Sequence, residues 1–192
     1  LHNIAFGKIY PKIIGRGHQR NDTVCHIGPT NYSVFMNKIR FPWASVVGKY
    51  DWDDLIGKMW DLHHLASGRL EKIKNPYLKF FKSINHFYAV CEDKKDIEWL
   101  GLIKFSKDWG NIVKLSEALD HPVNGKTFVA NTHKTKGLEW NKVVLHEFGS
   151  PQKCLLDKEN PQERLNLLYV ACTRAMTEVE NAPEIMYSDL WK

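Results

Sequence analysis

Cysteine pairs, long hydrophobic runs and internal repeats are all missing from this 192-residue chain. Its four cysteines, Cys25, Cys91, Cys154 and Cys172, include no CxxC pair, so reduced thiols are expected. No apolar run approaches the roughly 20 residues of a membrane span, and no charged-then-apolar leader opens the sequence. We therefore expect a globular intracellular protein that does not enter a membrane.

A phosphate-binding loop is missing as well. The spacing GxxxxGK[ST] occurs nowhere, and Gly15 and Gly17 mark only a basic turn. The adjacent His63 and His64 would point in different directions from a helix, with no further ligand at metal spacing, so no metal site is predicted. The formal net charge of +5 permits nucleic-acid binding without demonstrating it.

The most informative stretch comes near the C-terminal end. Apolar runs at 127–130 and 143–145 predict two strands, and the polar segment between them predicts a connecting loop. That loop contains His133, Lys136, Gly137 and Glu139. These side chains can transfer protons, bind anions and accept from hydroxyls, and the glycine would form the bend. Taken alone, most such loops are merely solvated.

A second informative stretch is an amphipathic helix predicted between residues 162 and 175. Apolar residues recur there at i, i+3, i+4 and i+7, which is typical of one buried helix face. The residues of that face are Leu165, Leu168, Tyr169 and Cys172. Arg174 lies near the C-terminal end, where a cation interacts favourably with the helix dipole. On these residues alone, Arg174 would be a capping cation.

The rest of the chain divides into three parts, at 1–46, 47–122 and 123–192. A strand at 23–27 and a helix from Asn31 to Ile39, with Val34, Phe35 and Ile39 inward, are predicted in the first part. The middle part is predicted to be all helical: Trp52 to Gly68, Pro76 to Tyr88, and two helices around 97–103 and 112–119. Apolar spacing places Phe80 on the buried face of the second of these helices and Ile97 on that of the third. Its aromatic residues alternate with lysines, a pattern that would suit stacking on single-stranded nucleic acid. A helical core with solvated lysines is the favoured interpretation.

The two informative stretches resemble motifs of one helicase family. Motif V of superfamily 1 helicases of the UvrD/Rep type is similar to His-Lys-Thr-Lys-Gly-Leu-Glu-Trp at 133–140. Motif VI is similar to Asn-Leu-Leu-Tyr-Val-Ala-Cys-Thr-Arg-Ala at 166–175. Both occur in the family's order and at a typical interval.

Weaker similarities extend this resemblance toward the N-terminus. Motif IV resembles Pro29-Thr-Asn31, and the stretch before it resembles Phe6-Gly7 with Gly17-His-Gln19. The eukaryotic F-box DNA helicase branch is indicated by Asn166, Trp60-Asp-Leu-His and Ile73-Lys-Asn-Pro.

The resemblance implies an α/β fold and a set of partners. It implies a second RecA-like domain (2A, residues 1–46 and 123–192) split by a helical 2B-type insertion (47–122). It also implies ATP with Mg²⁺, bound in a cleft against an N-terminal RecA-like domain supplied in cis or by the full-length protein. Single-stranded DNA would be the other partner, and the nucleus the location.

The resemblance also implies a role for each matching residue. Arg174 would be the finger on the γ-phosphate, because its fixed donors suit bidentate phosphate binding. The residues implied for ATP binding are Lys136, Gly137, Glu139 and Arg174, with Glu139 accepting from the ribose hydroxyl. Those implied for DNA binding are Asn131, Thr132 and His133. The Mg²⁺ ligands are expected on the other domain.

Several positions depart from the family pattern. Asn131 stands where threonine is usual, and Pro29 and Ala5 stand where arginines are usual. The strand expected after motif VI is interrupted by Glu178, Glu180 and Pro183.

The largest departure is the lack of a Walker A lysine and a Walker B acidic pair in this chain. The implied function is therefore the C-terminal part of an ATP-dependent DNA helicase, inactive alone. The alternative is a non-catalytic helicase remnant that binds nucleic acid or protein, and a helical interaction protein with accidental motifs is the third interpretation.

Overall fold

The computed structural model describes residues 22–148 and 161–181, which form two compact units. The sheet unit contains residues 22–37, 43–48, 123–148 and 161–181. The helical unit contains residues 38–42 and 49–122. The similarities and departures noted at Ala5, Phe6-Gly7, Gly17-His-Gln19 and Pro183, and the thiol of Cys154, lie outside the described residues.

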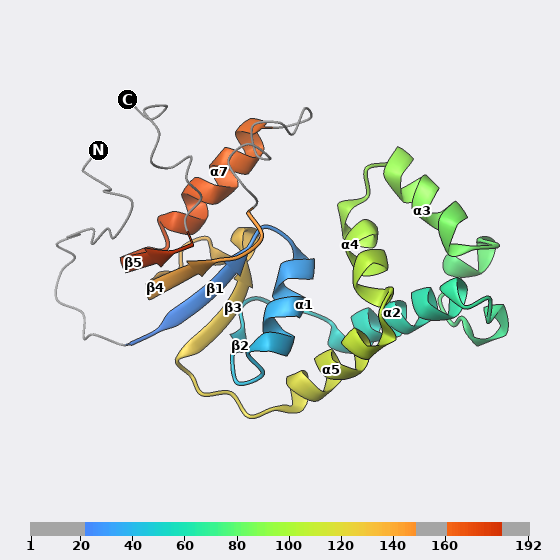
Figure 1. Cartoon of the computed structure of the whole chain (residues 1–192), viewed down its shortest axis with the longest axis horizontal. Coiled ribbons are helices and arrows are strands. Elements are labelled where there is room, and N and C mark those ends of the chain that lie inside the picture. Colours follow the sequence, from blue (N-terminus) through green and yellow to red (C-terminus); the bar gives the residue numbers. More distant parts are fainter. Residues whose placement is uncertain (1–21, 149–160, 182–192) are drawn as a thin grey trace. The chain divides into compact units, whose positions relative to one another are not determined.

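A five-stranded, all-parallel sheet forms the centre of the sheet unit, in the order β2–β3–β1–β4–β5 (Figure 1). Its strands are β1 (Val24–Gly28), β2 (Ser45–Val46), β3 (Thr127–Asn131), β4 (Trp140–Leu145) and β5 (Ala175–Glu180). The central strand β1 is buried at four of its five positions, as expected of a parallel strand covered on both faces. The α/β class and the strands predicted at 23–27, 127–130 and 143–145 are confirmed.

The last strand forms despite its two glutamates. Lys142 on β4 lies opposite Glu178 on β5. Its ammonium lies 3.5 Å from the Glu178 carboxylate and also donates to Glu180. The expectation that these glutamates interrupt the strand was wrong, because a lysine on the neighbouring strand pairs with both.

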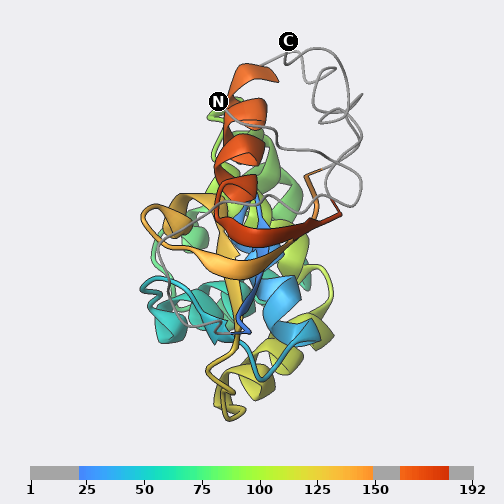
Figure 2. The same ribbon diagram turned by 90° about the vertical axis from the view of Figure 1, so that its left-hand side faces the viewer.

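One face of the sheet is covered by α7 (Pro161–Cys172), and α1 (Asn31–Arg40) lies on the other side (Figures 1 and 2). Leu168, Ala171 and Cys172 on α7 join the core formed with β1, β3 and β4. Tyr169 was predicted to belong to this face, but 48% of its surface is exposed. The helix turns Ala171 inward instead.

The buried face of α1 differs from the prediction at one position. Val34 and Phe35 are buried as expected, whereas Ile39 is only half-buried and Lys38 beside it is 2% exposed. The Lys38 ammonium donates to the carbonyl of Pro42 at 2.5 Å, which satisfies a charge taken out of water. The same burial lowers the pKa of Lys38.

The helical unit consists of α2 (Trp52–Ala66), α3 (Ile84–Asp93), α4 (Ile97–Ser106) and α5 (Trp109–Asp120), with two short 3₁₀ turns between α2 and α3. These turns are η1 (Leu70–Lys72) and η2 (Leu78–Phe80). A side-chain cap begins each α-helix by accepting a backbone N–H, which fixes the helix starts. The caps are Asp51, Ser83, Asp96 and Asp108.

The helix predicted from Pro76 to Tyr88 was wrong in its first half. The Asn75 side chain accepts from the backbone of Tyr77 and Leu78, which closes a single 3₁₀ turn, and Ser83 then caps a new helix. Phe80, placed on the buried face by its spacing, is therefore 81% exposed. Ile97 at the start of α4 is likewise 72% exposed rather than buried.

Candidate nucleotide and nucleic-acid site

The loop that carries the motif V similarity begins with three buried polar side chains. It opens with a 3₁₀ turn, η3 (Thr132–Thr135), directly after β3. Asn131 is 5% exposed, and its side-chain amide oxygen (Oδ1) accepts from the backbone N–H of Lys134 at 3.0 Å. Its amide group donates to the Asn31 side chain at 2.6 Å. Asn131 thus joins the end of β3 to the start of α1.

The two threonines of η3 are also internal. The Thr132 hydroxyl donates to the carbonyl of Gly28 at 3.3 Å, and the Thr135 hydroxyl donates to the carbonyl of Thr132 at 2.7 Å. A side chain at position 28 could not be accommodated, because its Cβ would lie 2.2 Å from that of Ser33. Of the three residues implied for DNA binding, only His133 presents its side chain to solvent.

The second half of the loop, residues 136–139, is exposed. Gly137 has φ +80° and open space where a Cβ would stand, so the backbone conformation itself favours glycine there. The N–H of Leu138 donates to the carbonyl of Thr135 at 3.0 Å, which closes the turn. Glu139 then leaves its carboxylate in solvent just before β4 begins.

Arg174 lies beside this second half. Its backbone carbonyl accepts from the N–H of Trp140 at 2.9 Å, and one terminal guanidinium nitrogen (Nη1) donates to the carbonyl of Leu138 at 3.4 Å. The Nε–H donates to the carbonyl of Val170 at 3.2 Å, and the other terminal nitrogen (Nη2) donates to the Thr173 hydroxyl at 3.1 Å. Arg174 therefore caps the last turn of α7 and also contacts the loop between Gly137 and Glu139.

The loop separates the implied residues into two groups. Because β3 and β4 are parallel, the chain leaves β3 at the C-terminal end of the strands and must enter β4 at their N-terminal end. Asn131 and His133 therefore lie near the C-terminal end of the strands, whereas Glu139 and Arg174 lie near the N-terminal end.

Sequence reasoning missed a polar cluster where β1 and β4 end. His26 and His146 share a hydrogen bond of 2.9 Å between ring nitrogens, and the Ser33 hydroxyl donates to the Glu147 carboxylate at 2.7 Å. Glu147 has φ +58°, which is uncommon for a non-glycine residue. Burial and then the Glu147 carboxylate raise the pKa of Tyr32. The available signal was the position of His146 and Glu147 directly after an apolar strand.

A family model decides what these features belong to. The UvrD-like helicase C-terminal domain matches residues 52–179, from the first turn of α2 into β5. This span contains both the loop with the motif V similarity and the helix that ends before Arg174. The chain belongs to the UvrD-like helicase C-terminal domain family. A search of curated proteins found no match.

The family match and the structure together bear on three expectations. The α/β fold, with its parallel sheet and helical unit, is that of a RecA-like helicase C-terminal domain. The match begins after β1 and α1, so the motif IV similarity at Pro29 lies outside it. No helix among the described residues has the length and apolar character needed to cross a membrane.

The family implies ATP with Mg²⁺, and the residues present fit the nucleotide better than the metal. Arg174 offers a planar cationic donor set beside an exposed turn, which suits phosphate oxygens. In the part of the chain that is described, no group of three or more histidine, cysteine, aspartate or glutamate side chains could hold a metal ion. That the Mg²⁺ ligands lie on another domain stays a prediction.

Proposed function

We propose that this chain is the C-terminal part of an ATP-dependent DNA helicase that couples ATP hydrolysis to movement along single-stranded DNA. In this proposal the sheet unit is domain 2A and the helical unit is a 2B-type insertion. The F-box DNA helicase branch, and with it a nuclear location, is supported by the segments at Trp60 and Ile73 and by Asn166. The family match over residues 52–179 supports the helicase assignment itself.

The observation that carries the nucleotide half of the proposal is the contact between Arg174 and the Leu138 carbonyl. It brings the motif VI cation against the turn of motif V, so that Lys136, Glu139 and Arg174 lie around one short exposed segment. When ATP binds against a Walker A domain, Arg174 would exchange protein carbonyls for γ-phosphate oxygens and stabilise charge in the transition state. Glu139 would accept from the ribose hydroxyl.

The DNA half of the proposal rests on His133. This side chain is exposed where β3 ends, while Asn131 and Thr132 hold the backbone beneath it through Asn31 and Gly28. In this arrangement the His133 side chain would contact the single-stranded DNA directly, and Asn131 and Thr132 would position that side chain. The short loop between His133 and Glu139 would then link the DNA site to the nucleotide site.

The experiment that tests this function uses Arg174. In a protein that joins this chain to a Walker A-bearing domain, Arg174→Ala should lower kcat for DNA-stimulated ATP hydrolysis on the order of 10³-fold. Arg174→Lys should remain impaired, because a lysine keeps the charge and loses the planar fork. Lys126→Ala, which removes an exposed cation before β3, is the matched control and should leave kcat unchanged.

This chain by itself should show no measurable DNA-stimulated ATPase, because it contains no Walker A lysine and no Walker B acidic pair. Turnover by the chain that disappeared in Arg174→Ala would contradict this. Unchanged kcat in the joined protein carrying Arg174→Ala would contradict the finger role.

The alternative function, a non-catalytic remnant that binds nucleic acid or protein, is favoured by one observation. Pro29, directly after β1, replaces the arginine expected to make a second γ-phosphate contact. The flanking genomic sequence discriminates the two. An upstream exon encoding GxxxxGK[ST] and an acidic motif favours the helicase, and an intact start codon directly before Leu1 without such an exon favours the remnant.

A further inference from the structure

The segment from Arg69 to Lys82 in the helical unit is anchored by buried side chains and by hydrogen bonds to its backbone. Ile73, Leu78 and Phe81 are 2%, 0% and 8% exposed and anchor the segment in the helical core. The buried carboxylate of Asp61 accepts from the backbone N–H groups of Lys74 and Asn75, at 3.0 and 2.7 Å. A segment fixed at so many points presents its remaining side chains in a defined arrangement.

The side chains that this segment presents to solvent are mainly aromatic and basic, although Leu70 is also 44% exposed. Phe80 is 81% exposed, and Tyr77, which is 42% exposed, shares its side of the η2 turn because residues three apart eclipse in a 3₁₀ turn. The Tyr77 ring is braced edge-on by Phe81 at 5.3 Å and Phe87 at 5.9 Å between centroids. Leu78 and Phe81, on either side of Phe80 in the sequence, are buried instead.

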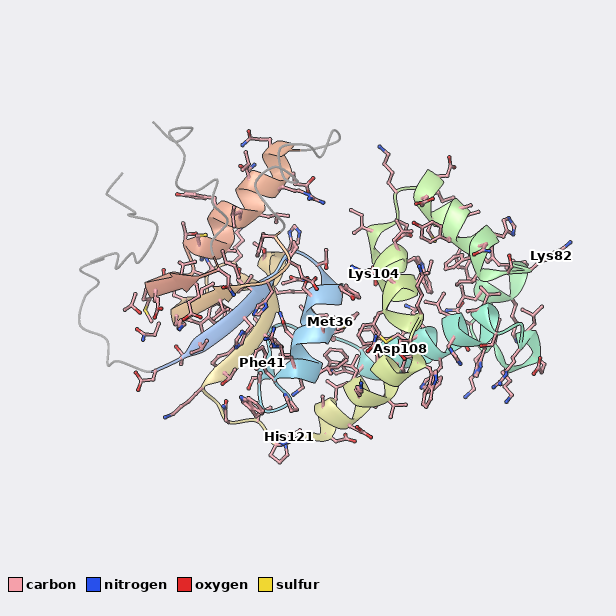
Figure 3. The ribbon with its side chains drawn as sticks, in the orientation of Figure 1. Met36, Phe41, Lys82, Lys104, Asp108 and His121 are labelled. Atoms are coloured by element: carbon pink, nitrogen blue, oxygen red, sulfur yellow. The ribbon has the colours of Figure 1, made fainter. Side chains whose placement is uncertain are left out.

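The charged side chains of this segment are almost all positive. Five exposed cations lie within these 14 residues, against one carboxylate, Glu71. The cations are Arg69, Lys72, Lys74, Lys79 and Lys82. Figure 3 shows Lys82 pointing away from the ribbon into solvent. The pKa of His64 is lowered first by burial and then by electrostatic interaction with His63 and Lys72.

We propose that the Phe80 surface, formed by Tyr77, Phe80 and these five cations, binds single-stranded nucleic acid by stacking a base on Phe80 while the cations contact phosphates. An aromatic side chain in a positively charged surface is the pairing that binds single strands without sequence preference. A protein partner is less suited, because four of the five exposed cations are lysines, which are depleted in protein interfaces. The proposal rests on the proposed function only in taking single-stranded DNA as the ligand.

The matched control is another exposed apolar residue of the same unit. Ile97 is 72% exposed at the start of α4, and the residues directly beside it in the sequence are Asp96 and Glu98, so it has similar exposure next to carboxylates rather than lysines. Truncating it removes exposed apolar surface without touching a phosphate-binding arrangement.

The test is a fluorescence-anisotropy titration of the whole chain with a labelled oligothymidylate of about 12 nucleotides. Phe80→Ala should weaken binding about five- to hundredfold, Phe80→Trp should retain it, and Ile97→Ala should leave it unchanged. On an abasic oligonucleotide of the same length, Phe80→Ala should bind like the unmodified chain. Lys79→Gln with Lys82→Gln should lower the slope of log affinity against log salt by about 1.4.

Four outcomes would overturn the proposal. These are no binding by the unmodified chain, equal binding by Phe80→Ala, equal losses in Phe80→Ala and Ile97→Ala, or the same loss on the abasic strand. Circular dichroism should show unchanged folding, because Phe80 contributes little to the core. The Arg174 experiment depends on none of these results, so a failure here leaves the nucleotide half of the proposed function untouched.

Discussion

Two loops, one in each unit, use the same local device for different ends. Asn131 in the sheet unit and Asn75 in the helical unit each accept backbone N–H groups and so close a single 3₁₀ turn. The anchors beneath the turns differ. Thr135 is held under η3 by a hydrogen bond to backbone, whereas Leu78 is held in η2 by apolar packing.

This difference decides what each loop can present. Hydrogen-bonded anchors fix direction as well as position, and the loop after Asn131 exposes His133 and Glu139, groups whose chemistry depends on direction. The η2 turn itself is anchored by apolar packing, while Asp61 hydrogen-bonds only to the backbone just before it. The loop after Asn75 exposes Phe80 among lysines, which suits a ligand held by stacking and charge. One turn type therefore serves two kinds of surface.

The largest effect is expected where the helical loop is clamped. Asp61→Ala removes a buried acceptor of two backbone N–H groups and should cost the helical unit about 3 kcal/mol of unfolding free energy. Urea denaturation measures it, with Asp93→Ala, an exposed carboxylate at the end of α3, as the control. A loss below about 0.5 kcal/mol would mean that the apolar anchors alone hold the segment.

The two caps themselves offer a smaller and more direct comparison. Asn131→Ala should cost about 2 kcal/mol, because it removes a cap and also the hydrogen bond to the partly buried Asn31. Asn75→Ala, which removes only a cap, should cost about 1 kcal/mol. Hydrogen exchange should show faster opening of η3 in the first variant and of η2 in the second. Equal costs would refute the idea that polar anchors couple more of the structure.

The smallest effect is a loss of stability in alkali. Burial raises the pKa of Cys172 in the sheet unit to about 12, and burial followed by Asp96 raises that of Cys91 in the helical unit to about 11. A thiol with a raised pKa stabilises the fold below its unfolded pKa near 9, and this is lost as pH rises through 9 toward the folded value. Each should lose about 1 kcal/mol by pH 10.

Cysteine-to-alanine variants of the two units separate these contributions. Cys172→Ala and Cys91→Ala should each flatten the fall in unfolding free energy between pH 8 and pH 10, measured by urea denaturation. An unchanged alkaline slope in either variant would show that the corresponding thiol ionises alike in the folded and unfolded states.

The sheet unit was largely predictable because its signals are local and unambiguous. Apolar runs gave the strands, and two motif-length similarities predicted that Arg174 and the Gly137 turn belong to one site. In the structure the Arg174 guanidinium donates to the carbonyl of Leu138, next to Gly137, while their shared role in nucleotide binding stays a prediction. The strand after Arg174 was missed because its glutamates are matched by Lys142, a residue 36 positions before Glu178 that no local pattern connects to them.

The helical unit was less predictable for a physical reason. Periodicity placed Phe80 on a buried face, but the hydrogen bonds of Asn75 and the cap at Ser83 divide the predicted helix into two elements. Such competition between side-chain and helical hydrogen bonds does not change apolar spacing, so periodicity cannot register it. The burial of Lys38 depends likewise on a carbonyl at Pro42 that only the folded chain brings near.

The loop between β3 and β4 has a mechanical consequence. Eight residues, 132–139, span the strand length between one sheet edge and the other, and four of them are fixed in η3. So few residues leave almost no slack to absorb a shift at either end. A ligand that displaced His133 would therefore pull on the turn at Gly137, and through the Leu138 carbonyl it would load the guanidinium of Arg174. The loop would therefore couple movements at its two ends. Lengthening it by a few glycines would remove this coupling without removing any side chain.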